Sequence, residues 1–103
     1  MSDRLKSLLK LLEQDPNDSF LSYGIALEHI STDNYKEAER YLSSIIKKDP
    51  DYVPAYMQLA QVYENLNLID KAKSIYKEGI EIARTNNDSH AADEMEDFLN
   101  ELK

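Results

Sequence analysis

The amino-acid sequence predicts an all-α fold, a right-handed α-solenoid of antiparallel helix pairs with about six helices and no strand. One observation is a repeat: residues 53–82 align with the segment before them at a constant offset of 34 residues and without a gap. A fixed period of this length is typical of helical-repeat proteins. The other is that apolar residues in each copy recur at the three- and four-residue spacing of an amphipathic helix. Because one helix pair cannot bury its apolar face alone, we expect neighbouring pairs to stack.

The two copies agree at their apolar positions. Six residues of the later copy fall on six of the earlier one: Ile69, Ala72, Ile75, Tyr76, Gly79 and Ile80 fall on Tyr35, Ala38, Tyr41, Leu42, Ile45 and Ile46. The same offset carries Asp49-Pro50 onto Asp15-Pro16. The period therefore extends toward the N-terminus.

The later copy resembles the tetratricopeptide repeat, whose pattern is Trp-x-x-Leu-Gly-x-x-Tyr, then Ala-x-x-x-Phe and a closing Pro. The matching residues are Tyr56, Leu59, Ala60 and Tyr63 in the first helix, and Ala72 and Tyr76 in the second. The earlier copy has Ser22 and His29 where the family has aromatic residues. It keeps other positions of the pattern, namely Ile25, Ala26, Ala38, Leu42 and Pro50. The resemblance implies a small two-repeat member of the family with flanking helices.

At 103 residues, the chain is long enough for one domain with a single modest core. The sequence therefore predicts a single domain over residues 1–103. Its expected parts are an N-terminal helix at 1–15, repeat one at 17–50, repeat two at 51–84 and a C-terminal capping helix at 88–103.

The first predicted helix covers residues 2–14. Four leucines share one face of it: Leu5, Leu8, Leu9 and Leu12. Asp15-Pro16 is expected to end it, because the residue before a proline disfavours the helical conformation. Each of three residues that follow is a suitable cap for the next helix: Asn17, Asp18 and Ser19.

Repeat one is expected to place helices at 19–31 and 35–48. Asp33 lies in the turn between them, and Asn67 in the equivalent turn of repeat two, where the family commonly has glycine. Asn and Asp are the other residues that best tolerate a left-handed conformation. Asn34 and Glu37 have the spacing of a capping box. The second helix is expected to bury six residues: Tyr35, Ala38, Tyr41, Leu42, Ile45 and Ile46.

Repeat two is expected to place helices at 54–65 and 69–84. Gly79 lies inside the second of these, where glycine costs roughly 1 kcal/mol relative to alanine. This cost indicates a neighbouring helix too close for a side chain, with a flexible hinge as the alternative. After Ala83 the period lapses, and a turn at 86–89 leads to a last helix. Its apolar face contains six residues: Ala91, Ala92, Met95, Phe98, Leu99 and Leu102.

The chain carries 12 basic and 20 acidic residues, a formal net charge of -8, which opposes nonspecific binding to nucleic acid or anionic membranes. We therefore expect no nucleic acid and no membrane among its partners. Lys6 and Lys10 interrupt the leucines near the N-terminus, so no signal peptide or membrane span is predicted. Without cysteine, neither a disulfide nor a thiolate zinc site can form. The expected location is cytoplasmic.

The sequence offers no convergent catalytic residues, so we predict no enzyme activity, cofactor or metal site. His29 lies on the apolar repeat face, where a packed histidine is expected rather than a general base. His90 and Glu94 lie four residues apart, but two ligands without a third make a weak metal site. The only glycines are Gly24 and Gly79, so no phosphate-binding loop is present.

The resemblance places a candidate binding groove on the first helix of each repeat, which lines a concave surface in the family. The corresponding positions form two stripes: Phe20, Tyr23, Leu27 and Ile30, then Met57, Gln58, Gln61, Glu64 and Asn65. Family members that hold the C-terminal carboxylates of chaperones use lysine, arginine and asparagine here. The comparable places in this chain carry Tyr23, Leu27, Met57 and Gln61. The sequence leaves open whether Phe20, Tyr23 and Leu27 face solvent or lie beneath the chain's own helices.

Two functions follow from these observations. The first is a noncatalytic protein-protein interaction module that binds a peptide or helix in its concave groove. The mixture of apolar and polar positions suits a ligand with an apolar anchor and neighbouring hydrogen-bonding or basic groups. The alternative is a self-assembling, homo-oligomeric repeat unit, because three or more repeats are usually needed for stability. Its basic N-terminal helix, with Arg4, Lys6 and Lys10, is then expected to contact the acidic last helix of another copy.

Overall fold

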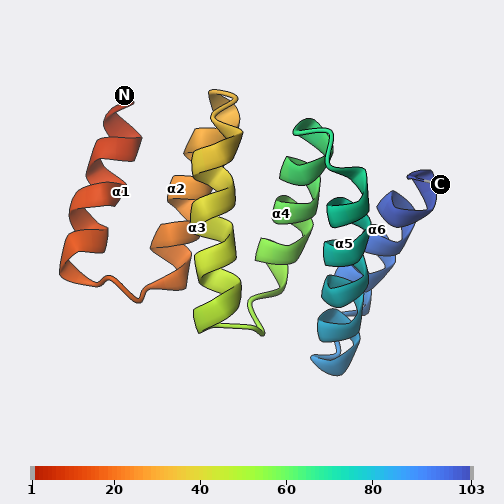
Figure 1. Cartoon of the computed structure of the whole chain (residues 1–103). Coiled ribbons are helices and arrows are strands. Elements are labelled where there is room, and N and C mark those ends of the chain that lie inside the picture. The colour runs from red at the N-terminus through yellow and green to blue at the C-terminus, as the bar shows by residue number, and fades with distance from the viewer. Residues whose placement is uncertain (1, 103) are drawn as a thin grey trace.

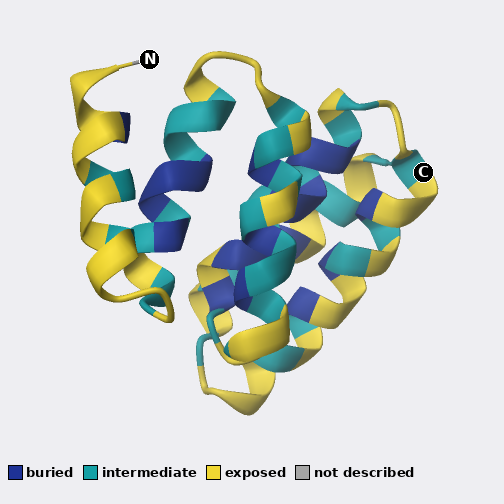
Figure 2. Ribbon diagram, turned by 60° about the vertical axis from the view of Figure 1, so that its left-hand side comes forward, coloured by how far each residue is buried: buried dark blue, intermediate teal, exposed yellow. Residues whose placement is uncertain are grey.

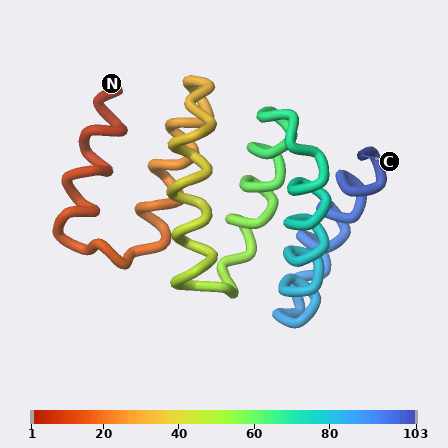
Figure 3. The backbone as a smooth tube through the Cα atoms, viewed as in Figure 1, coloured from red at the N-terminus to blue at the C-terminus, as the bar shows by residue number. Residues whose placement is uncertain are grey.

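The computed structural model describes residues 2–102, which form six α-helices and no strand. The helices are α1 (Asp3–Gln14), α2 (Ser19–Ser31), α3 (Tyr35–Lys48), α4 (Val53–Asn65), α5 (Ile69–Thr85) and α6 (Ser89–Glu101). Each helix packs against the next one along the chain, so the molecule extends in one direction from α1 to α6 (Figure 1). The backbone runs up and down between the two ends (Figure 3). The predicted all-α, six-helix solenoid is confirmed.

Side-chain caps begin three of the helices. Asp18 is the cap of α2, and its carboxylate accepts the backbone N–H of Leu21 at 3.1 Å. Asn34 holds the cap position of α3 but makes no side-chain bond to the helix, so the predicted capping box is wrong. Its amide nitrogen lies 3.4 Å from Nδ1 of His29 instead. The residue type therefore predicted where the helix begins, but not which group the Asn34 side chain contacts. The three side-chain caps are Ser2, Asp18 and Asp88.

Three turns share one helix-ending geometry. Asp33 and Asn67 have positive φ values of 59° and 64°, as predicted, and Asn87 has the same conformation with a φ of 61°. In each turn the next backbone N–H donates to a carbonyl five residues earlier at 2.8 Å, for example from Leu68 to Tyr63. These bonds satisfy helix-end carbonyls that otherwise lack a partner. The turn after α5 is thus built like the turns after α2 and α4.

The core consists of two clusters that follow one another along the solenoid. The cluster nearer the N-terminus joins α2, α3, α4 and α5, and its largest members include Leu42, Ile45 and Leu59. The second joins α4, α5 and α6 around Tyr76 and Met95. Buried positions lie on the inner sides of the helices, whereas α1 exposes most of its surface (Figure 2). Both clusters thus join helices of neighbouring pairs, as stacking of repeats requires.

Of the six residues of α3 that were predicted to be buried, half are buried. Ala38, Leu42 and Ile45 are buried, but the other three predicted residues are only partly buried. Tyr35, one of these three, keeps its polar end at the surface, where its hydroxyl donates to Asp33 at 2.9 Å. A phenolic hydroxyl needs a hydrogen-bond partner when it is buried, so an edge position suits it better. The three partly buried residues are Tyr35, Tyr41 and Ile46.

Gly79 is buried where α5 meets both of its neighbours. A Cβ atom at this position would lie 2.6 Å from Sδ of Met95 on α6 and 2.7 Å from Cβ of Tyr56 on α4. Both distances are too short for any side chain. The predicted close approach is confirmed, and two helices make it.

None of the helices within residues 2–102 combines the length and the apolar content that crossing a lipid bilayer requires.

Candidate functional site

The stripe predicted on α2 reaches the molecular surface. Phe20 is 72% exposed, which is far more than any core residue, so no helix of the described chain covers it. Tyr23, Leu27 and Ile30 are partly buried. The ring of Tyr23 packs at a tilt against Tyr52, with 5.6 Å between the ring centroids. The stripe thus has an open end at Phe20 and a supported middle at Tyr23.

Most of the stripe predicted on α4 is partly buried. Met57, Gln58, Gln61 and Glu64 are partly buried, and Asn65 is exposed. The two stripes approach each other at Tyr23 and Gln58. Burial raises the pKa of Tyr23 above its ordinary value, and the polar side chain of Gln58 opposes that rise. The structure therefore brings together residues of α2 and α4 that lie about one repeat apart in the sequence.

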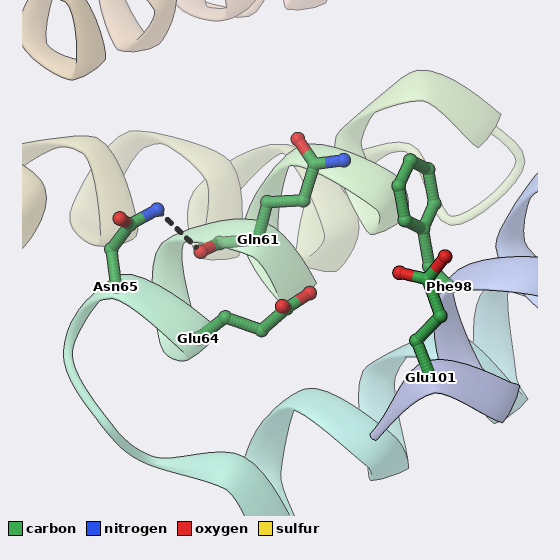
Figure 4. A pocket seen from close by; sticks show the side chains of 5 residues that line it. All are labelled: Gln61, Glu64, Asn65, Phe98 and Glu101. Carbon is green, nitrogen blue, oxygen red and sulfur yellow. Dashed lines mark hydrogen bonds between the residues drawn. The ribbon is translucent and has the colours of Figure 1, made fainter.

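A hollow of about 410 Å³ lies between the end of the α4 stripe and α6 (Figure 4). Gln61, Glu64 and Asn65 line it from α4, and all three were predicted. Phe98 and Glu101 line it from α6 and were not predicted as site residues. The Glu64 side chain extends from α4 toward α6, and the carboxylate of Glu101 lies beside Phe98 on the opposite side of the hollow (Figure 4). Carboxylate, amide and aromatic groups thus share one concave surface.

A partly buried hydrogen bond fixes the Glu64 side chain. The hydroxyl of the fully buried Tyr76 donates to Oε2 of Glu64 at 2.5 Å. Burial raises the pKa of the Tyr76 phenol far above its ordinary value, and the bond to Glu64 raises it further. Tyr76 also stacks on Phe98, with 6.0 Å between centroids and 17° between ring planes. Tyr76 on α5 therefore positions two lining residues, one from each side of the hollow.

The two histidines considered for chemistry make ordinary packing and surface contacts. His29 is partly buried, and its ring stacks on Tyr41 with 5.9 Å between centroids. His90 is exposed, and its Nε2 lies 3.2 Å from Oε1 of Glu94. Within residues 2–102, no group of three His, Asp or Glu side chains is close enough to hold a metal ion. What the site offers is a shaped surface with hydrogen-bonding groups, which suits noncovalent binding.

Sequence comparison finds the same repeat in a family model and in a protein of known sequence. A family model described as "Tetratricopeptide repeat" matches residues 29–93. A TPR repeat-containing protein of Methanocaldococcus jannaschii is 42% identical over 52 residues, which make up 50% of this chain and 16% of that protein. The chain therefore spans only a small part of the length of this curated relative.

Structure comparison finds similar solenoids. The crystal structure of a tetratricopeptide repeat domain protein from Salinibacter ruber is 34% identical, with a TM-score of 0.78 over 82% of this chain and 94% of that chain. A protein from Bordetella parapertussis is 20% identical, with a TM-score of 0.86 over 99% of this chain and 89% of that chain. The TPR2B domain of yeast Sti1, in its complex with pHsp70, is 18% identical, with a TM-score of 0.90 over 95% of this chain and 78% of that chain. At these identities, the last two similarities concern the fold alone.

Proposed function

The chain belongs to the tetratricopeptide repeat family, whose members generally serve as noncatalytic protein-protein interaction modules. We propose that it binds a peptide or helix of a partner protein in its concave groove. The groove is defined here by the two predicted stripes and the two further residues of the hollow. These are Phe20, Tyr23, Leu27, Ile30, Met57, Gln58, Gln61, Glu64, Asn65, Phe98 and Glu101.

The observation that carries the proposal is the open state of this surface in a chain whose core is already complete. Phe20 is exposed at one end of the groove, and the hollow beside Glu64 lies at the other. A partner that covers Phe20 gains apolar burial, and the amides and carboxylates of the hollow then orient it through hydrogen bonds. The chain therefore offers both contributions that a binding site needs, an exposed apolar group on α2 and a polar hollow between α4 and α6.

The test is to select binders from a display library of short random peptides and to titrate a selected peptide against groove variants. Tyr23→Ala and Met57→Ala are each expected to weaken binding by about 1 to 2 kcal/mol, because truncation removes a partly desolvated anchor contact. Leu11→Ala is the matched control, since Leu11 is a large apolar residue, 49% exposed, on α1 outside the groove. Melting curves check that each variant folds. If both groove variants bind like the parent, the binding surface lies elsewhere.

Head-to-tail assembly of copies remains the alternative prediction, and the chain's own ion pairs weaken its electrostatic basis. Arg4 on α1 already pairs with Glu28 at 2.8 Å. On α6, Asp93 and Glu96 pair with Arg84 at 3.5 and 3.3 Å. Light scattering over a concentration and salt series tests the alternative, because a contact between charged helices weakens as salt rises. A monomer that is insensitive to salt contradicts it.

A further inference from the structure

Basic and acidic residues are distributed over different helices. Every lysine and arginine within residues 2–102 lies on α1, α3 or α5. The three helices that contribute to the groove, α2, α4 and α6, contain no lysine or arginine and carry seven acidic residues. This separation follows the architecture, because the helices of the groove alternate with the others along the solenoid. The groove therefore has a negative electrostatic potential without a compensating cation on its own helices.

Ion pairs within the chain neutralise the acids outside the hollow more than those inside it. Glu28 is paired with Arg4, and Arg84 is shared by two acids on α6. Glu64 and Glu101, in contrast, form no ion pair with any lysine or arginine of the described chain. The hydrogen-bond donor to Glu64 is the neutral hydroxyl of Tyr76. Both carboxylates of the hollow thus keep their charge available for a ligand.

We infer that the segment bound in the groove is basic, with a lysine or arginine side chain in the hollow and an apolar side chain at the Phe20 end. This inference rests on the proposed function and adds the charge of the partner. An ammonium or guanidinium group between Glu64 and Glu101 forms charge-assisted hydrogen bonds with both carboxylates. The ring of Phe98 lines the same hollow, so an aromatic group also lies within reach of the bound cation.

The same arrangement disfavours an acidic segment. A carboxylate in the hollow would lie next to Glu64 and Glu101, and like charges brought together in a partly desolvated site repel. The groove helices provide no cation to offset this repulsion. The specificity is therefore set by repulsion of acidic ligands as well as attraction of basic ones.

The charge of selected peptides is the first readout. Display selection of short random peptides on the full chain is expected to enrich lysine and arginine and to deplete aspartate and glutamate, together with a large apolar residue. Binders that are acidic or have no charge preference overturn the inference and leave the proposed function standing. A selection that yields no binder overturns both.

The second readout is a pair of matched double variants, titrated with a selected basic peptide by fluorescence anisotropy. Glu64→Gln with Glu101→Gln is expected to weaken binding about fivefold at low ionic strength, and less at high salt. Glutamine keeps an oxygen acceptor for the Tyr76 hydroxyl, so the fold is retained. Glu78→Gln with Glu81→Gln removes the same charge from α5, outside the groove, and is expected to leave affinity unchanged. Equal losses in the two double variants overturn the inference, because net charge then explains the attraction.

A second copy of the chain is the competing occupant, since its α3 and α5 carry lysines. Light scattering at the concentrations of the titration separates the two cases. A monomer that binds the basic peptide supports the inference. A dimer that dissociates in the Glu64→Gln, Glu101→Gln variant identifies another copy as the occupant and overturns it.

Discussion

Gly24 and Gly79 differ in what surrounds them. At Gly79, the Cβ of Tyr56 would lie 2.7 Å from an added Cβ, and it cannot rotate away because it is attached directly to the α4 backbone. At Gly24, an added Cβ would meet the tip of Leu8 at 3.3 Å. That tip is the end of a flexible, partly buried side chain on α1. A substitution is therefore expected to separate two helices at Gly79 and to move one side chain at Gly24.

The prediction for Gly79 is a loss of stability by overpacking. Gly79→Ala is expected to destabilise the fold by about 1 to 3 kcal/mol, although alanine is the better helix former, and Gly79→Leu by at least as much. Urea unfolding monitored by circular dichroism measures the change. A variant that unfolds at the same urea concentration as the parent shows that the helices are not in tight contact there.

Gly24→Ala supplies the matched prediction. Leu8 can move by a few tenths of an ångström, so the gain in helix propensity should prevail and stabilise the fold by up to about 1 kcal/mol. The same unfolding measurement applies. A destabilisation as large as that of Gly79→Ala would mean that α1 packs on α2 more rigidly than the partial burial of Leu8 indicates.

At the scale of helices, the cap contacts predict how much stability is lost when the side chain at a helix N-terminus is removed. Asp88 accepts the backbone N–H of Ala91 at 3.1 Å, so Asp88→Ala is expected to destabilise by about 1 kcal/mol. Asn34 holds the same position on α3 without such a bond. Asn34→Ala is therefore expected to cost less than about 0.5 kcal/mol. Thermal unfolding of the two variants makes the comparison, and equal losses contradict the role given to the Asp88 side chain.

The helix bounds could be predicted from the sequence because local signals determine them. Asp15-Pro16 and Asp49-Pro50 end α1 and α3, and the left-handed residues Asp33 and Asn67 end α2 and α4. These signals act within a few residues. Whether the Asn34 side chain turns to its own helix or to His29 depends on a neighbour in space, so the capping box was wrong.

The part of the site on α6 could not be predicted because the period fails before it. Helix α5 has 17 residues, whereas α3 has 14, so the 34-residue offset no longer relates α6 to the earlier groove helices. Phe98 was expected on the apolar inner face of the last helix, and it does stack on Tyr76 there. Phe98 also lines the hollow together with Glu101. This position depends on how α6 packs against α4 and α5, which the repeat period does not determine.

At the scale of the whole molecule, tyrosines link the core to the alkaline stability of the fold. Burial is the main cause that raises the pKa of five of them above the ordinary 10.0, because a phenolate loses solvation inside the protein. These five are Tyr23, Tyr52, Tyr56, Tyr63 and Tyr76. Tyr76 has the largest rise, with Glu64 as a hydrogen-bond acceptor that also disfavours the phenolate.

The fold is therefore expected to lose stability as pH rises above about 10. Below that pH, folded and unfolded chains both hold the phenol protons, so the tyrosines add no pH dependence. Above it, the unfolded chain releases protons that the folded chain retains, which favours unfolding. Tyr76→Phe should lower stability by about 1.5 to 3 kcal/mol at neutral pH, because it removes the bond to the Glu64 carboxylate. It should also reduce the alkaline slope by up to about 1.4 kcal/mol per pH unit, since one titrating group is gone. In urea unfolding over a pH series, the stabilities of the parent and the variant should converge as pH rises, and parallel curves would contradict the role of the buried Tyr76 phenol.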